Sequence, residues 1–407
     1  MKKNDKQNAQ TACAVICEYN PFHNGHRRQL EEMRALSGCD ILFCLMSGNF
    51  VQRGEAAVLD KHTRAAHAVL GGADAVLELP VSFAAGNAET FAAGAMNILS
   101  RIPAVKKLAF GCECGKAEDF FAAARLSLEE PPAFRDALRR ELDAGQSFAK
   151  ARFAALKAGM PLADERLFSA PNNMLGIEYA NAVLRTGADI GLLPLRRTGA
   201  GETDGKLHEN LSSASAIRNA LYAGGMSEKI RKNVPEFVFE DLPLALDKSR
   251  AERLDAAEYY ALVSAPAERV AGAPDCSEGL EHRLQNLAEE CFTAEEVVQR
   301  ATSRRYTAAR LRRILLSLAL GIEEHDVRRF LRAPLYCNVL AVNAAKADET
   351  LGVLSRSGLP LLVRKGDEEA LTDDAKDCFA LNERADKIYR ALCRRPLNFY
   401  AARLVRR

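Results

Sequence analysis

Residues 18–26 read EYNPFHNGH and directly follow the apolar run 12–17, ACAVIC. Asn, Pro and Gly are common turn residues, but a plain surface turn has no use for two histidines. The apolar run predicts a short buried strand, and the residues after the turn predict a helix. The turn therefore opens a helix, whose free N–H groups and partial positive charge favour phosphate. Either the histidines are incidental, or this turn binds a charged ligand.

The spacing of His23 and His26 favours the second alternative. Two imidazoles one turn apart can donate hydrogen bonds to a phosphate as its charge grows during displacement. Gly25, between them, lets a ligand approach the backbone closely. HNGH resembles the HxGH pattern of nucleotidylyltransferases, in which both imidazoles contact a nucleotide's phosphates. On this motif alone, a chance match of four residues is an equal alternative.

A second motif fits the same chemistry. Residues 211–218 read LSSASAIR, which is similar to the ISSTxIR pattern of that superfamily. Ser213 and Ser215 offer hydroxyl and N–H groups to phosphate oxygens, and Arg218 offers a guanidinium for a bidentate contact. The alternative is an ordinary serine N-cap followed by a solvated arginine. The order and spacing of this motif relative to HNGH favour a phosphate site.

Alternating apolar runs and helical patterns predict the fold of the first part. Strands are expected at 12–17, 40–46, 75–79, 107–110 and 189–193. Helices are expected at 27–36, 62–70, 87–102, 132–142 and 147–158. This order is typical of an α/β protein with a parallel sheet, in which ligands bind at the carboxyl ends of the strands. We expect such a domain over residues 1–225.

Beyond about residue 225 the alternation fades, and a mainly helical region is expected over 226–407. The segment 263–279 is rich in Ala, Pro and Gly, which predicts a connector. Within 306–320, an amphipathic helix is predicted by apolar residues at the helical period, which are Leu311, Ile314, Leu315 and Leu318. Further strands are expected at 339–342 and 360–363.

Composition indicates the class of protein. A chain of 407 residues with 48% hydrophobic and 27% charged residues predicts a soluble globular protein of two or three domains. The net charge of +2 leaves only a local patch for nucleic acid. Eleven cysteines, placed mostly in apolar segments, favour reduced thiols and a cytoplasmic location. No segment predicts a signal peptide or a membrane span, and the tight pair Cys112 and Cys114 does not predict a metal site.

Further polar residues are expected near the phosphate site. Residues 47–65 read SGNFVQRGEAAVLDKHTRA. This segment is expected to place Arg53, Lys61 and Arg64 near the mouth of the site. Gly111, just after a predicted strand, can pass under a base or a ribose.

Two other segments each allow two interpretations. Asn172 and Asn173 either cap a helix or give one side chain to adenosine. Residues 196–201, RRTGAG, match the R-x-x-G-x-G pattern by which GNAT acetyltransferases hold acetyl-CoA, but that pattern needs a following helix. Residues 202–210 have no apolar period, so we expect a loop that brings Arg197 to the phosphates of ATP.

Seven segments together closely resemble the tRNA(Met) cytidine acetate ligase family: EYNPFHNGH, SGNFVQRG, GADAVLELP, FGCECG, PNNMLGIEY, RRTGAG and SASAIR. The resemblance covers nearly the whole chain and is densest over 12–222. It implies a HIGH-type, nucleotidyltransferase-like (HUP-type) fold. It also implies an enzyme that forms acetyl-adenylate from acetate and ATP and acetylates N4 of the wobble cytidine (C34) of elongator tRNA(Met). Bound Mg²⁺ is compatible with the use of ATP. The sequence does not indicate an oligomeric state.

The resemblance and the motifs together imply His23 and His26 as catalytic residues. They imply ATP contacts at the turn and at four further places, which are Ile16, Cys17, Glu18, Tyr19, Asn20, Pro21, Phe22, His23, Asn24, Gly25, His26, Arg27, Arg28, Gln29, Gly111, Asn172, Asn173, Arg197, Ser213, Ser215 and Arg218. The chain departs from the family in FGCECG, which has cysteines in place of a serine and a small residue. It also departs in GAGETDG, which lacks the aromatic-His pair that often follows the arginine and leaves the contacts of Arg197 less supported.

An arginine-rich helix is the expected tRNA contact. Residues 304–313 read RRYTAARLRR, with Arg310 and Arg313 expected opposite the apolar stripe and Arg305 and Arg312 on one flank. All charged residues of this segment are positive, and it contains a tyrosine, which favours contact with an RNA backbone. Three more arginines follow within 328–332. A merely solvated helix face is the alternative.

Two functions of other classes stay open. An adenylyl- or cytidylyltransferase acting on a small phosphorylated metabolite would use the same HNGH turn but would not need the arginine-rich second half. A non-enzymatic RNA-binding protein on a decayed nucleotidyltransferase fold would not need intact HNGH and SASAIR motifs.

Overall fold

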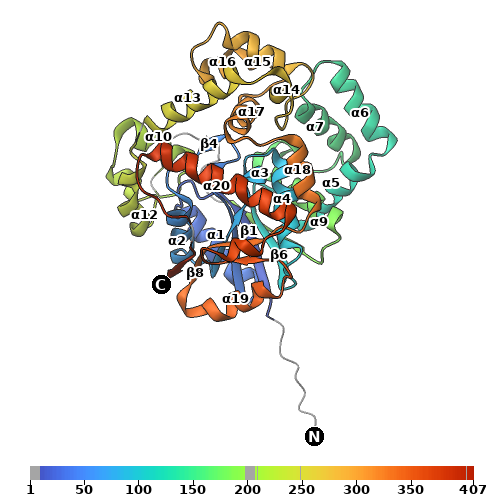
Figure 1. Ribbon diagram of the computed structural model, residues 1–407. Coiled ribbons are helices and arrows are strands. Elements are labelled where there is room, and N and C mark those ends of the chain that lie inside the picture. Colours follow the sequence, from blue (N-terminus) through green and yellow to red (C-terminus); the bar gives the residue numbers. More distant parts are fainter. Residues whose placement is uncertain (1–9, 198–206, 209, 248, 400) are drawn as a thin grey trace.

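An eight-stranded sheet forms the centre of the molecule in the computed structural model, which describes residues 10–197, 207, 208, 210–247, 249–399 and 401–407 (Figure 1). The strand order is β10-β8-β5-β2-β1-β6-β7, with β9 beside β8. Five strands run parallel: β1 Ala12–Cys17, β2 Ile41–Ser47, β5 Ala75–Leu79, β6 Val105–Cys112 and β7 Gly191–Arg196. The five strands expected in the first part are thus confirmed, as is the α/β class.

The first strand, β1, divides its side chains between two cores. Cys13 and Val15 pack with buried residues of α1 and α2 on one face of the sheet. Ala14 and Ile16 pack with residues of α4, α5 and α9 on the other face. Because a strand points successive side chains to opposite faces, a run as apolar as ACAVIC is expected to lie between two covered faces.

Helices cover both faces of the sheet, as the sequence predicts. The first face carries α1 Asn24–Ser37 and α2 Lys61–Leu70. The other face carries α3 Val81–Ala84, α4 Ala88–Leu99, α5 Ala117–Glu129 and α9 Pro171–Thr186. The chain between α5 and α9 forms α6 Pro132–Asp143, α7 Phe148–Gly159 and α8 Arg166–Ser169.

The second part of the chain is mainly helical. After α10 Ala214–Gly224, α11 Glu228–Arg231 and α12 Glu236–Asp241 comes a bundle with its own core: α13 Ser249–Ser264, α14 Ala267–Ala271, α15 Leu280–Ala288, α16 Ala294–Ala301 and α17 Ala308–Leu320. The four apolar residues predicted for α17 lie in this core. The expected connector at 263–279 is partly wrong, because Pro266 caps the start of the short helix α14.

The central sheet contains strands from both sides of residue 225, the expected domain boundary. After α18 Glu324–Arg332, strand β8 Cys337–Asn343 pairs with β5 in antiparallel orientation. The edge is completed by β9 Leu361–Leu362 and β10 Arg403–Val405, while α19 Ala347–Ser355 and the long α20 Asp373–Cys393 connect these strands. Figure 1 shows the red C-terminal segment beside the blue N-terminal strands. Pairing covers the edge of β5, which would otherwise expose free N–H and C=O groups.

Among the described residues, no helix is both long and apolar enough to cross a membrane.

Candidate active site

A cavity of about 280 Å³ lies at the carboxyl ends of β1, β6 and β7. These ends contribute Cys17, Gly111 and Arg196 to its lining. The strand order reverses at β1, since β2 lies on one side of it and β6 on the other, and such a switch point is where open α/β sheets bind ligands. Further parts of the wall come from the 18–26 turn, from segments 51–55 and 211–218, and from helices α1, α4 and α9.

The two histidines of HNGH are stacked at the start of α1. Their ring centroids are 3.6 Å apart, and His23 is the N-cap residue, with its Nδ1 accepting a hydrogen bond of 3.0 Å from the N–H of Gly25. A Cβ on Gly25 would lie only 2.9 Å from the His23 ring, so this cap requires glycine. Because Nδ1 accepts, a neutral His23 carries its proton on Nε2 and can donate it to a phosphate.

The fold buries His23 and half-buries His26. His23 is only 6% exposed. Burial, together with the nearby charge of Arg197, lowers the pKa of His23 to about 3. Burial, His23 and Arg197 also lower the pKa of His26 well below its usual value. Both imidazoles are therefore neutral donors at neutral pH before any anion binds.

These depressed pKa values predict how stability depends on pH. In the unfolded chain both imidazoles take up a proton near pH 6.5, whereas the folded protein keeps them neutral to lower pH. The unfolded state binds more protons below that pH, so the free energy of unfolding should fall as the pH drops from about 6.5 toward 4. Urea denaturation across this range should show a shallower fall in a His23→Asn variant. An equal slope would contradict a buried neutral imidazole.

Arg197 and Arg218 both line the cavity. Arg218 Nη1 donates to the carbonyl of Asn20 at 2.8 Å, and its Nη2 lies 3.4 Å from Ser215 Oγ. The N–H of Arg197 donates to the carbonyl of Cys112, and its side chain lies against Gly111, where a Cβ would be 3.2 Å away. Glycine at this position leaves room for the arginine stem.

Ser213 of the LSSASAIR motif caps a helix, as the N-cap interpretation of that motif predicts. Ser213 is the N-cap of α10 and accepts a hydrogen bond from the N–H of Ala216 at 3.2 Å. Ser213 and Ser215 both also line the cavity, so the N-terminus of α10 faces it. Two helix N-termini, those of α1 and α10, therefore border the same cavity, and both favour anions.

The two asparagines have separate positions. Asn172 lines the cavity, with its Nδ2 donating to Glu113 Oε1 at 2.6 Å. Asn173 is fully buried outside the cavity wall, where its amide contacts the N–H of Glu113 and the carbonyl of Arg166. Its expected ATP contact is therefore wrong. The expected cap is wrong too, because α9 begins at Pro171 and neither asparagine is its N-cap.

Most of the expected ATP contacts line the cavity. Of the run 16–29, four residues do not belong to the lining, namely Pro21, Phe22, Asn24 and Arg27. Phe22 is fully buried, Asn24 Nδ2 donates to the carbonyl of Lys232, and Arg27 pairs with Glu31 on the surface. Some residues of the turn thus line the cavity, and others hold the turn in place.

The sequence did not single out several lining residues. They are Glu32, Val51, Gln52, Glu55, Phe91, Phe110, Leu175, Tyr179, Leu195, Arg196, Leu211, Ser212 and Ala214. All of them except Glu32, Phe91 and Leu195 lie inside segments quoted in the sequence analysis, where they are neighbours of the residues named there.

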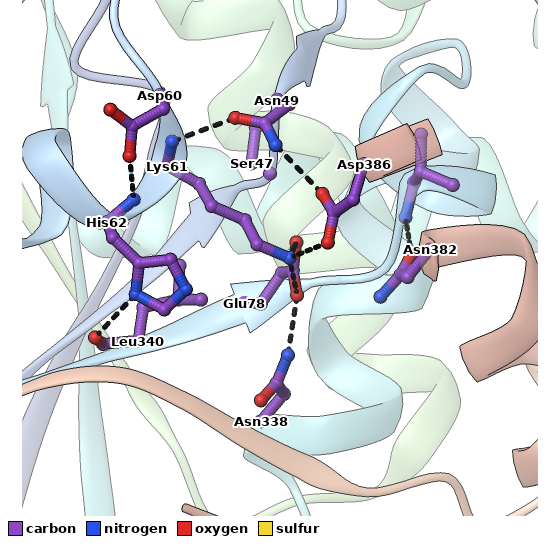
Figure 2. A network of polar contacts seen from close by, with 12 residues as sticks. Ser47, Asn49, Asp60, Lys61, His62, Glu78, Asn338, Leu340, Asn382 and Asp386 are labelled. Carbon is purple, nitrogen blue, oxygen red and sulfur yellow. Dashed lines mark hydrogen bonds and ion pairs between the residues drawn. The ribbon is translucent and has the colours of Figure 1, made fainter. Parts of the chain in front are cut away.

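The expected placement of Lys61 and Arg64 near the mouth is wrong. Figure 2 shows the ammonium of Lys61 between the carboxylates of Glu78 and Asp386, at 2.8 and 2.7 Å. Arg64 is completely buried, and its guanidinium donates to backbone carbonyls that include those of Glu18 and Ser47. Both cations support the fold from inside, and neither lines the cavity.

The arginines expected to contact tRNA are all engaged with nearby oxygen atoms. Arg310 donates to the carbonyl of Asp275 at 2.8 Å, and Arg313 pairs with the carboxylate of the same residue at 3.1 Å. Arg312 pairs with Glu295, and Arg305 pairs with Glu278. Arg313, expected opposite the apolar stripe, has a side chain that is only 15% exposed.

The sequence and the fold both have known relatives. The family model of the HIGH Nucleotidyl Transferases matches residues 10–402. The chain is 34% identical over 380 residues to the tRNA(Met) cytidine acetate ligase of Acetivibrio thermocellus, with 89% of each chain covered. It is 30% identical over 404 residues to the enzyme of that name from Clostridium acetobutylicum, with 96% of this chain and 98% of that one covered.

Two crystal structures of Thermotoga maritima TmcAL share the fold over 98% of this chain and 100% of the other. The apo form has a TM-score of 0.89 at 29% identity. The form bound with alpha-thio ATP has a TM-score of 0.87 at 28% identity. The agreement extends over both the sheet and the helical second part, and the chain belongs to the tRNA(Met) cytidine acetate ligase family of HIGH nucleotidyl transferases.

Proposed function

We propose that this protein joins acetate to ATP as acetyl-adenylate in the cavity and transfers the acetyl group to N4 of the wobble cytidine C34 of elongator tRNA(Met). The observation that carries the proposal is the stacked pair His23 and His26 beside Arg197 and Arg218, at a helix N-terminus. A ligase of this kind would act in the cytoplasm, where tRNA is modified.

The charges of the cavity suit a nucleoside triphosphate. Five arginines line it, against three glutamates. Guanidinium groups and helix N-termini are the donors that hold phosphate oxygens. One or two carboxylates together with phosphate oxygens form the usual ligand set of Mg²⁺, so the three glutamates, Glu18, Glu32 and Glu55, are compatible with Mg²⁺ that arrives with ATP.

The chemistry follows from the weak reactivity of both partners. An oxygen of acetate attacks the α-phosphorus of ATP, the bond to the β-phosphate oxygen breaks, and diphosphate leaves. His23 Nε2–H and His26 stabilise the negative charge that grows on the phosphate oxygens. The N4 amine of cytidine then attacks the acetyl carbonyl of the mixed anhydride. AMP leaves, and the amine loses one proton.

An isotope experiment tests the proposal. Labelled acetate with ATP should label the tRNA, and labelled acetyl-CoA alone should not. Acetate-dependent exchange of diphosphate into ATP should also occur without tRNA, because the adenylate forms first. Transfer from acetyl-CoA without ATP would overturn the assignment. Labelling of a small phosphorylated metabolite by the nucleotide would favour the transferase alternative.

We further propose that residues 226–407 supply the tRNA contacts, with α17 among them. Arg310 and Arg313 hold Asp275, so replacing them would also disturb a loop. Arg305 gives a cleaner test, because its side chain is 60% exposed. In an Arg305→Ala variant, the slope of log affinity for tRNA against log salt should fall by about one unit per lost phosphate contact. An unchanged slope would remove Arg305 from the contact.

The chain offers a matched control for this variant. Arg101 is also exposed. It lies just before the amino end of β6, whereas the cavity lies at the carboxyl ends of the strands. An Arg101→Ala variant should keep the slope of the wild-type protein. Equal losses in both variants would indicate a general charge effect.

A further inference from the structure

The loop of residues 47–60 forms one wall of the cavity. Within it, only β3 Phe50–Val51 and β4 Glu55–Ala56 pair with each other, as a two-stranded ribbon. A ribbon of this size is not stable by itself. Its position must therefore be set by the elements against which it packs.

On the cavity side, this loop is bonded to the turn that carries the two histidines. The N–H of Gln52 donates to Glu18 Oε1 at 2.8 Å, and the N–H of Val58 donates to Asn20 Oδ1 at 2.8 Å. Asn20 in turn accepts the hydrogen bond from Arg218. A shift of the loop would therefore move both the turn and Arg218.

On the opposite side, residues of the second part of the chain hold the same loop. Arg250 of α13, which is only 4% exposed, donates to the carbonyls of Ala57 and Val58 at 2.9 and 2.7 Å. The hydroxyl of Tyr389 in α20 donates to the carbonyl of Ala57 at 2.8 Å. Asp386 of α20 accepts a hydrogen bond of 2.8 Å from Asn49 (Figure 2).

The apex of the ribbon meets helix α17 at Gly54. This residue has a φ of +76°, and a Cβ on it would lie 2.8 Å from the carbonyl carbon of Arg312 and 2.9 Å from the backbone nitrogen of Arg313. Backbone atoms inside a helix cannot move singly. A side chain at residue 54 would therefore push the ribbon away from α17 and toward the cavity.

We propose that α13, α17 and α20 position the wall of the ATP cavity through the 47–60 loop, with Gly54, Arg250 and Tyr389 as positioning residues. The second part of the chain then has two tasks, because it shapes the nucleotide site as well as serving the proposed tRNA contact. This inference rests on the proposed adenylation for its assay.

The test compares two glycines with the same backbone angle. Gly145 also has a φ of +76°, but nothing lies within 4 Å of its Cβ position. Both alanine variants place a side chain at the same positive φ, and only Gly54→Ala collides with a helix. We expect Gly54→Ala to raise the Kd of α,β-methylene ATP and to slow acetate-dependent diphosphate exchange, each about 10-fold, because displaced binding groups lose their alignment. Gly145→Ala should match the wild-type protein in both.

The Kd separates positioning from simple instability. A variant that is only less stable has fewer folded molecules, but those molecules bind the analogue with unchanged affinity. Equal Kd values for Gly54→Ala and Gly145→Ala would overturn the inference. If Gly54→Ala does not fold, Tyr389→Phe decides, because it removes one hydroxyl and keeps the ring. We expect its Kd to rise about fivefold, the effect of one hydrogen bond, and an unchanged Kd would overturn the inference.

The wild-type protein distinguishes failure of the two proposals. If it binds the analogue and catalyses exchange while the variants match it, only the positioning inference fails. If the wild-type protein shows neither binding nor exchange, the proposed function fails, and the positioning inference fails with it.

Discussion

Replacing His23 by Asn is expected to slow acetate-dependent diphosphate exchange by about 10²–10³, the effect of removing one preorganised donor to a developing charge. Asparagine is a favoured N-cap residue, so its side chain can keep the hydrogen bond to the N–H of Gly25 that His23 makes. The variant therefore removes the imidazole and retains the cap. Its unfolding temperature at neutral pH should stay close to that of the wild-type protein.

His23→Ala provides the comparison that separates the two roles. It should lose the same factor in rate and, in addition, about 1 kcal/mol of stability through the missing cap. His26→Ala should also lose about 10²–10³ in rate, since its ring stacks on His23 above the same cavity. Exchange at the wild-type rate in His23→Asn would show that the imidazole does not act on the phosphate.

The fold of the first part and the HNGH turn could be predicted because their causes are local. A run such as ACAVIC gives a buried strand, and a helix N-terminus is set by the few residues around its cap. His23 indeed caps α1 through Gly25, two residues away. Nothing in this local pattern indicated that His23 would be buried, because its surroundings include Arg197 from the end of β7.

The wrong placements have distant causes. Lys61 follows a polar loop and was expected to face the ligand, yet its partner Asp386 lies 325 residues further along the chain. The arginines of α17 stay proposed RNA contacts, but they pair with acids from other parts of the bundle, which are Asp275 in the loop between α14 and α15 and Glu295 in α16. The charge of one segment does not show which opposite charges folding will bring to it.

Replacing Lys61 by Met is expected to lower the free energy of unfolding by about 3–5 kcal/mol, because it leaves buried carboxylates without their cation. Glu78 and Asp386 both contact the ammonium, and their side chains are only 3% and 13% exposed. Urea denaturation measures the change. Lys106→Met is the matched control, because Lys106 also pairs with a carboxylate, that of Asp189, but on the surface. It should change stability little.

The pH dependence of this loss tests the same cluster independently. Burial and the charge of Glu78 raise the pKa of Asp386 to about 7, although Lys61 opposes that rise. A carboxyl with a raised pKa keeps its proton in the folded protein while the unfolded chain ionises, so it costs stability as the pH rises from about 4 through 7. Removing the ammonium removes the group that favours the ionised form of Asp386, so the loss of stability in Lys61→Met should be larger at pH 8 than at pH 5.

Adding Asp386→Asn to the variant should recover part of the stability at pH 8. A loss equal at both pH values, or as small as that of Lys106→Met, would show that the carboxylates do not depend on Lys61.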